Sequence, residues 1–276
     1  MRKLFDDYFQ GNISKRFLIF VCGSMAVFFF AGGIVLAACF FPGSYDWRYQ
    51  GMSILWSRAD NPAGHLFWSL GLVSALLLCL PSCGYFLRRL EPWSPRVAHR
   101  AGFALRTGYI AGILVGLESA FFPNFGGYIY KAHEYTAIVA FSGIYLGAAG
   151  FWYCLTVWLL EDRRWLAWAM GGLFLLCAAP VAGAILSQAW LFFDPHRPPW
   201  VSPEWVRLGI PLWLSIAFWE WLGACGLVIC VTVLAIVLPA KPHEIGEPAV
   251  RSVPPIPPGS RFDVAVRESP ESDDQK

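Results

Sequence analysis

Histidine and carboxylate side chains of this chain gather near the ends of its apolar runs. His65 begins one run, Glu118 lies near the end of the next, and the neighbours His133 and Glu134 begin a third. Imidazole and carboxylate groups transfer protons, bind polar head groups and ligate metals. Since ionisable groups are costly in apolar surroundings, their presence there indicates function. We expect His65, Glu118 and His133 to line one polar site.

The neighbours His133 and Glu134 have different expected roles. At helical spacing His133 shares a stripe with Ala137 and Phe141, whereas Glu134 is rotated about 100° away from it. A carboxylate in the first turn of a helix complements the helix dipole. Glu134 is therefore expected to support the start of the helix, and only His133 to face the site.

Five further polar residues are secondary candidates for the same site. Ser53 and Asn61 lie in the first loop, Asp194 and His196 follow the fifth apolar run, and Glu220 lies within the sixth. A carboxylate inside an apolar run needs water, a hydrogen-bond donor or a proton. Glu220 and Glu118 are for this reason the carboxylates whose positions are hardest to ascribe to chance.

Known catalytic motifs are missing from the sequence. Three histidines with carboxylates can hold zinc and leave a position for water, but no HExxH spacing is present. The chain also lacks a phosphate-binding glycine loop and a nucleophile elbow. We therefore predict no metal site and no cofactor, and the motifs name no reaction.

Composition places the chain in a membrane. Of its 276 residues, 57% are hydrophobic and 14% charged, and the mean hydropathy is +0.50. These values are too apolar for an ordinary soluble domain of this size. A net charge of +2 gives no reason to expect nucleic-acid binding.

Six apolar runs are long enough to cross a bilayer about 30 Å thick as helices. They predict an all-α, polytopic membrane protein with six transmembrane helices in one bundle, over residues 17–238. Residues 1–16 precede the bundle, and residues 239–276, rich in Pro, Ser and charge, are expected to be disordered. The predicted spans are Phe17–Phe41, His65–Phe86, Thr107–Phe122, His133–Leu160, Trp165–Phe193 and Leu208–Leu238.

The orientation follows from the basic residues. Sixteen lysines and arginines fall on one side of the six predicted spans and five on the other. By the positive-inside rule both termini are cytoplasmic, and the protein is expected in the cell membrane. The segment 95–106, with Arg96, Arg100 and Arg106, is expected at the inner head groups.

Cysteines, tryptophans and glycines in the runs predict packing. All eight cysteines lie in or at the ends of apolar runs, which favours free thiols. Gly108, Gly112 and Gly116 in the third span, with Gly143 and Gly147 in the fourth, predict close packing of these two spans. Seven tryptophans near span ends are expected as interfacial anchors: Trp47, Trp56, Trp68, Trp165, Trp190, Trp200 and Trp205.

A lipoprotein-like stretch, LAAC, ends at Cys39 after a basic leader and an apolar run. Processing there would remove the first span and leave a lipidated Cys39. The preceding apolar run, Phe17–Val35, exceeds the 7–15 residues usual for a signal-peptide core. We therefore expect the first span to be retained.

Three stretches together resemble one family. They are MSILWSRADNPAGHLFWSLGL (52–72), GYIAGILVGLESAFFPN (108–124) and HEYTAIVAFSGIYLG (133–147). They resemble the DRAM, Frag and Sfk type of six-helix membrane proteins and their prokaryotic relatives, catalogued mainly as a domain of unknown function. Ser53, Asn61, Pro62, Leu66 and Phe67 match the family's first-loop pattern.

The fourth span carries the family's other pattern. His133, Ala137 and Phe141 match it, while the following glycine, Gly143, stands one residue early. The chain departs from the family in the first loop, where Ile54 and Trp56 replace an Asp and a Gly. Eukaryotic members are associated with remodelling of membrane lipids, which implies membrane lipids as partners here.

Three classes of function remain open from the sequence. The first is a lipid-associated membrane protein whose outer polar cavity, lined by His65, Glu118 and His133, meets a lipid head group or a partner protein. The second is an outer-leaflet hydrolase or acyltransferase using the same residues, with or without a metal. A small transporter is the least favoured, because the chain shows no inverted repeat of broken helices.

Overall fold

The computed structural model describes residues 2–121, 132–193 and 209–240, which form helices and turns without any strand. The all-α prediction holds for this part of the chain. The elements are α1 (Arg2–Phe9), η1 (Phe17–Gly23), α2 (Ser24–Cys39), α3 (Met52–Trp56), α4 (His65–Leu90), α5 (Pro95–Phe121), α7 (Ala132–Asp162), α8 (Arg164–Phe193), η3 (Leu212–Leu214) and α9 (Ile216–Val237).

Five helical segments are long and apolar enough to cross a membrane: Phe17–Cys39, α4, His133–Glu161 within α7, α8 and α9. The chain is therefore a multi-pass membrane protein by length and composition. The sixth predicted span, Thr107–Phe122, is the second half of the longer helix α5. The helix α5, whose first half carries Arg96, Arg100 and Arg106, is not one of the five.

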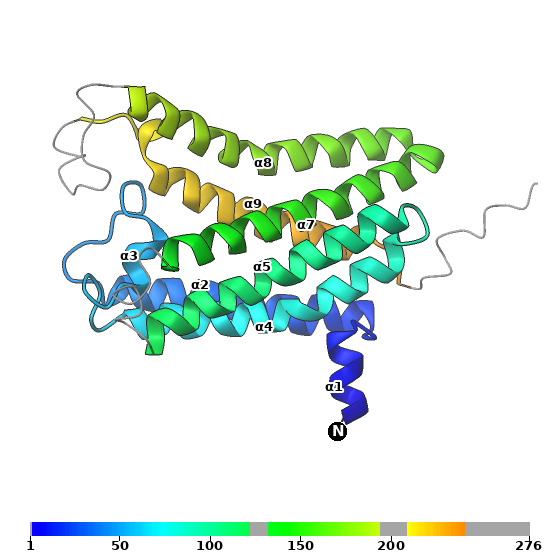
Figure 1. Ribbon diagram of the computed structural model, residues 1–276, viewed down its shortest axis with the longest axis horizontal. Coiled ribbons are helices and arrows are strands. Elements are labelled where there is room, and N and C mark those ends of the chain that lie inside the picture. Colours follow the sequence, from blue (N-terminus) through cyan, green and yellow to red (C-terminus); the bar gives the residue numbers. More distant parts are fainter. Residues whose placement is uncertain (1, 122–131, 194–208, 241–276) are drawn as a thin grey trace, which may run out of the picture.

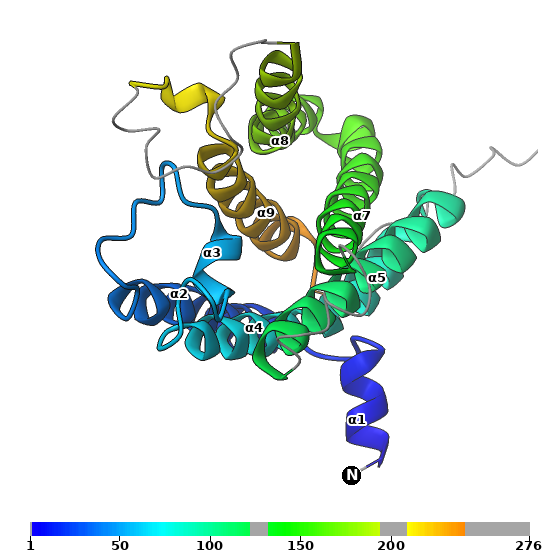
Figure 2. The same ribbon diagram turned by 60° about the vertical axis from the view of Figure 1, so that its left-hand side comes forward.

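The long helices form an incomplete ring. Each packs against the next in the order α2, α4, α5, α7, α8, α9, and Figure 2 shows them around a common interior. The helix α9 contacts η1, the start of the first span, near one end of the bundle. Near the other end it contacts α3. Between these two contacts α2 and α9 make no extensive contact, so the ring has an open side.

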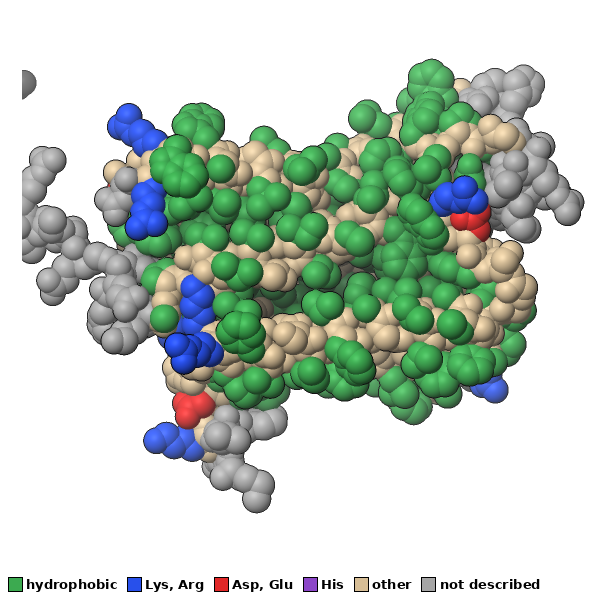
Figure 3. Space-filling view, turned by 180° about the vertical axis from the view of Figure 1, so that it is seen from behind, with side chains coloured by type: hydrophobic (Ala, Val, Ile, Leu, Met, Phe, Trp, Pro, Cys, Tyr) green, Lys and Arg blue, Asp and Glu red, His purple; other side chains and the backbone are tan. Residues whose placement is uncertain are grey.

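The two ends of the bundle carry different elements. We call one the α1 end, with α1, the turn between α4 and α5, and the last residues of α9. The other is the α3 end, with α3, the start of α4 and the start of α9. Lysine and arginine side chains are more numerous at the α1 end on the face seen in Figure 3.

Glycines bring the backbones of α5 and α7 together, as predicted. A Cβ atom built on Gly143 would lie 2.7 Å from the Cα atom of Gly108, and one on Gly147 would lie 2.6 Å from Leu105. Gly112 and Gly116, in contrast, face Leu76 and Val73 of α4. The glycine face of α5 therefore serves two neighbours.

The predicted start of the sixth span was wrong. The chain before α9 has a 3-10 turn after Pro211, so α9 begins at Ile216 and not at Leu208. Asn61 and Pro62 belong to the turn before α4, which begins at His65, the first residue of the predicted second span. The helix α5 begins at Pro95, directly after Ser94, which is a favoured position for proline.

The last turn of α9 is bound by two basic side chains from other segments. Lys15 Nζ donates to the carbonyl oxygens of Ile236 and Leu238 at 2.5 and 2.6 Å. The guanidinium of Arg89, buried in α4, donates to the carbonyl oxygens of Pro239 and Ala240 at 2.8 and 2.6 Å. Cations at a helix C-terminus complement its dipole and its unpaired carbonyl groups.

All eight cysteines are free thiols, as expected from their positions in apolar runs. The predicted disordered tail covers residues 239–276, of which Pro239 and Ala240 are described and bound by Arg89, and the residues from 241 onward lie outside the described part of the chain.

Candidate functional site

Glu118 and His133 lie together at the α3 end of the bundle. Glu118 lies in the last turn of α5 and His133 in the first turns of α7. Glu118 Oε2 and His133 Nδ1 are 3.8 Å apart, and the side chains are 15% and 30% exposed. This distance suits an ion pair but exceeds a normal hydrogen bond. The structure thus brings together two of the three main candidates.

An aromatic stack joins this pair to the interior. The ring of Trp56, in α3, meets the His133 ring edge-on with centroids 4.7 Å apart. Trp56 also stacks on Trp68 of α4 at 6.3 Å, and Trp68 contacts Phe30 of α2 at 5.2 Å. The glutamate–histidine pair therefore lies on the outer side of a chain of packed rings.

The tryptophans divide into two groups, and the anchor prediction was wrong for two of them. Trp47, Trp165 and Trp190 are exposed, as anchors should be. Trp56 and Trp68 are buried, 8% and 1% exposed respectively, because both face the bundle interior. Trp200 and Trp205 lie outside the described residues.

His65 is not part of the Glu118 and His133 pair in this structure. It is buried at the first residue of α4, and its Nδ1 lies 3.0 Å from the carbonyl oxygen of Pro62. Since a carbonyl only accepts, we assign the hydrogen to Nδ1. His65 makes its described contact within its own turn.

Asn61 has a structural role. Its fully buried amide donates to the carbonyl oxygens of Ala37 and Leu55, both at 2.9 Å, and accepts from the backbone N–H of Gly64 at 3.0 Å. These bonds join the ends of α2 and α3 to the start of α4. Its contacts account for this residue without a ligand.

Glu220, in the second turn of α9, supports α3. Its Oε2 accepts from the backbone N–H of Met52, the first residue of α3, at 3.2 Å. The same oxygen would lie 2.7 Å from a Cβ atom on Gly51, so a larger residue there would require the Glu220 carboxylate to shift. Ser53, the next candidate, is exposed beside Gly51. A carboxylate is well placed at a helix start.

The remaining candidates, Asp194 and His196, lie outside the described residues. Within the described ranges no three His, Cys, Asp or Glu side chains come close enough to hold a metal ion. The pair at the α3 end supplies two such groups, and no described residue adds a third that would complete a metal site.

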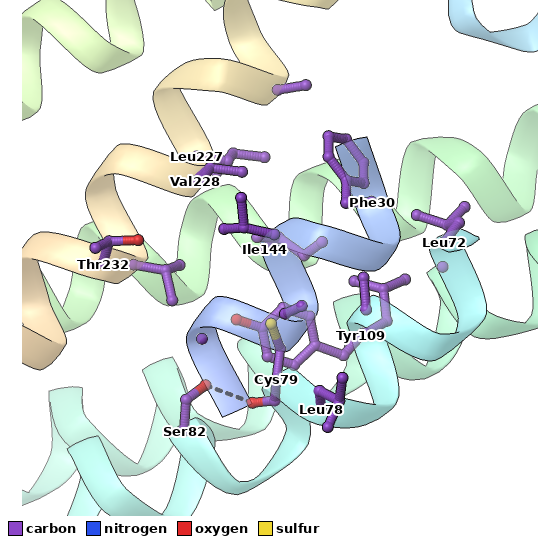
Figure 4. Close-up of a pocket in the computed structure, with 18 of the residues that line it drawn as sticks. Phe30, Leu72, Leu78, Cys79, Ser82, Tyr109, Ile144, Leu227, Val228 and Thr232 are labelled. Carbon is purple, nitrogen blue, oxygen red and sulfur yellow. Dashed lines mark hydrogen bonds between the residues drawn. The ribbon is translucent and has the colours of Figure 1, made fainter. Parts of the chain in front are cut away.

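A cavity of about 530 Å³ occupies the interior of the ring. Its wall is formed by η1, α2, α3, α4, α5, α7 and α9, whereas α8 does not contribute. Figure 4 shows Phe30, Leu72, Ile144 and Leu227 from four of these helices around the same space. The volume lies in the range of about 300–1,000 Å³ usual for small-molecule sites.

The cavity is apolar along its length and has few polar groups. Met52, Trp56, Trp68 and Glu220 line it at the α3 end, and Tyr109 lines it further in. Glu118 and His133 are not part of the cavity wall. Trp56 lines the cavity and contacts His133, so its ring lies between the cavity and this pair. Hydrocarbon fits such a space better than a polar solute does.

Sequence reasoning missed Trp56, Trp68 and Tyr109 as site residues. Trp56 and Trp68 resembled interfacial anchors because they lie near span ends. Tyr109 stands next to Gly108 on the glycine face of α5, and this was the available signal, because a polar aromatic on a packing face needs a partner.

Comparisons with protein-family models, with curated proteins and with solved structures found no match to this chain.

Proposed function

We propose that this chain is a membrane lipid-binding protein, and the observation that carries the proposal is the intramembrane cavity. A volume of about 530 Å³ with an almost wholly apolar wall suits hydrocarbon chains. In a dry bundle the same space would forgo dispersion contacts along all seven elements that line it. A bound hydrocarbon chain restores those contacts.

We further propose six spans, with α5 as the additional one and the α3 end facing outward. The helix α5 lies alongside both α4 and α7, which are themselves apolar enough to span. Its arginines fall in its first half, toward the α1 end, where they reach the head groups. An even number of spans and the basic asymmetry then place both termini in the cytoplasm.

Glu118 and His133 are the proposed contact for the lipid head group. They are half-buried at the α3 end, next to Trp56, which forms the cavity wall. A head group above Trp56 reaches the pair while the chains occupy the interior. The resemblance of the quoted motifs to the lipid-handling DRAM, Frag and Sfk type supports this assignment.

The test is native mass spectrometry of protein purified in a mild detergent. Wild-type protein should retain lipid. Thr232→Phe and Ala224→Leu, which enlarge side chains in the cavity wall, should lower the lipid-bound fraction at least twofold. Ala169→Phe, on the exposed face of α8, is the matched control and should behave as wild type. Wild-type protein without any bound lipid would refute the proposal.

A second candidate function is an outer-leaflet hydrolase or acyltransferase. The observation in its favour is the carboxylate of Glu118 beside the His133 ring, since a carboxylate that orients a histidine is a common part of acid–base catalysis. Lipid mass profiles of membranes with and without the protein separate the two candidates. A changed acyl pattern indicates chemistry, and an unchanged pattern with bound lipid indicates binding alone.

A further inference from the structure

Two side chains of the cavity wall have a buried polar atom without a hydrogen-bond partner among the described residues, Trp68 at the α3 end and Tyr109 further in. Trp68 is 1% exposed, lines the cavity, and its indole N–H has no hydrogen-bond partner among the described residues. A buried N–H that stays unpaired costs about 1–3 kcal/mol in a folded protein. An acceptor oxygen on a bound molecule supplies what the chain itself does not.

The same end of the cavity holds one acceptor with spare capacity. Glu220 Oε2 accepts from the Met52 N–H, whereas Oε1 has no partner among the described residues. Trp68 lies one turn into α4 and Glu220 in the second turn of α9, so both belong to the α3 end. A group that both donates and accepts suits this combination, and a hydroxyl does both.

Charge restricts the head group further. The described residues that line the cavity include no lysine, arginine or histidine, and Glu220 is the one carboxylate among them. A phosphate in this space would have no cation to pair with and would lie near a carboxylate, which is costly at low dielectric. The wall therefore disfavours phospholipid head groups inside the cavity.

We propose that the cavity binds a neutral lipid with a hydroxyl head group, of the monoacylglycerol or diacylglycerol class, whose hydroxyl accepts from Trp68 and donates to Glu220. The inference rests on the proposed lipid-binding function and specifies its ligand. The acyl chain runs from Trp68 past Tyr109 toward the α1 end, along the apolar wall.

Access to the cavity is from the side, between α2 and α9. Val27 of α2 and Val228 of α9 both line the cavity and are both exposed, 47% and 37% respectively. Figure 3 views the side on which these helices lie and shows a hollow between bands of apolar side chains. Met52 and Trp56 of α3 line the cavity at its α3 end. A neutral lipid reaches the hollow from the bilayer without crossing water.

The experiment compares two photoreactive probes on the full chain in lipid nanodiscs. One is monooleoylglycerol with a diazirine in its chain, and the other is the matching lysophosphatidic acid, which differs by the phosphate. The neutral probe should label residues of the cavity wall at least fivefold more than the anionic probe. Trp68→Phe should lower labelling by the neutral probe about two- to tenfold, the usual value of one hydrogen bond.

Matched variants separate the ligand role from a structural one. Trp168→Phe, on the exposed face of α8, should label as wild type. Glu220→Gln keeps an oxygen that accepts from the Met52 N–H, so the fold should persist. Because the variant removes the negative charge, the ratio of labelling by the neutral probe to labelling by the anionic probe should fall. Val228→Trp should slow labelling, whereas its neighbour Ile229→Trp, exposed but outside the wall, should not.

The outcomes are distinguishable from failure of the proposed function. Equal labelling by both probes overturns the ligand class, as does full labelling of Trp68→Phe. Lipid retained in native mass spectra without any labelling of the cavity wall overturns this inference and leaves lipid binding in place. An empty protein that neither probe labels overturns both.

Discussion

The Tyr8 hydroxyl donates a hydrogen bond to the carbonyl oxygen of Leu77 at 3.2 Å. That carbonyl would normally accept from the N–H four residues later in α4, but this position is Pro81, which has no N–H. Tyr8, in α1, therefore completes the hydrogen bonding of a different helix. Gly11, at φ +67°, lies directly against the α4 backbone at Pro81, Gly84 and Tyr85, where a Cβ atom would not fit.

Tyr8→Phe should lower stability by about 1 kcal/mol, because it removes this one bond and leaves the Leu77 carbonyl unpaired. Burial raises the pKa of Tyr8 from 10.0 to about 12. Because the pKa is higher in the folded protein than in the unfolded chain, the contribution of the Tyr8 hydroxyl to folding stability is complete below pH 10 and declines as the pH rises toward 12. Thermal unfolding in detergent should show a difference between wild type and variant that shrinks over this interval. Tyr153→Phe, at an exposed position of α7, should show no such difference.

Asn61→Ala should cost roughly 2–4 kcal/mol, because three buried hydrogen bonds of about 0.5–1.5 kcal/mol each are lost at once. The yield of folded protein and its unfolding temperature should both fall. Asp60→Asn, next to it but exposed, serves as the control and should change neither. A stable Asn61→Ala protein that had lost only lipid binding would contradict the structural role.

Gly143→Ala should destabilise the bundle by about 1–3 kcal/mol, since the new methyl group would meet the Gly108 backbone at 2.7 Å. Gly171→Ala, in α8, has nothing within 4 Å of the added atom. That control should be neutral or up to about 1 kcal/mol more stable, because alanine is the better helix former. Equal unfolding temperatures for both variants would mean that α5 and α7 are not in close contact.

His133→Ala and Glu118→Gln should each abolish head-group binding or activity without changing the amount of protein in the membrane. Because the two side chains act as a pair, the double variant should be no worse than either single one. Glu134→Gln, on another face of α7, should have a mild effect. Membrane lipid profiles and native mass spectra of the four variants provide the measurement, and normal behaviour of both single variants would remove the pair from the site.

Fusions to topology reporters test the six-span arrangement. A reporter at Lys276 should be active only if it works in the cytoplasm, and one near Asn124 only if it works outside. If α5 does not cross the membrane and the N-terminus is cytoplasmic, the result is reversed: the reporter near Asn124 is active only inside and the reporter at Lys276 only outside. Intact-protein mass should also show that residues 1–39 are retained.

Helix identities were predictable because long apolar runs allow few alternatives, and close packing of α5 on α7 followed from glycine spacing. The contact between Glu118 and His133 was also predictable, since both lie at span ends on the same side. The placement of His65 was not, because its ring bonds to the Pro62 carbonyl in a local turn that the sequence pattern does not specify.

The cavity could not be predicted from the sequence. The cavity exists because two helices of the bundle, α2 and α9, do not pack against each other along their length. Both helices are apolar, and their sequences would look the same if they were in contact. The same reason explains Trp56 and Trp68, which differ from the exposed tryptophans only in the direction of their helix faces. Their burial follows from α3, a helix of five residues too short to stand out in the sequence.

The bond from Lys15 to the end of α9 has a consequence for biosynthesis. Lys15 precedes the first span, yet its acceptors, the carbonyls of Ile236 and Leu238, belong to the last helix. The acceptors lie 221 and 223 residues after Lys15 in the sequence. The ribosome must therefore translate these residues before the ammonium group of Lys15 meets its partners. Until then the first hairpin, α2 with α4, must rely on its own contacts. Closure of the ring at the α1 end is thus a late event in assembly, after the last helix leaves the translocation machinery.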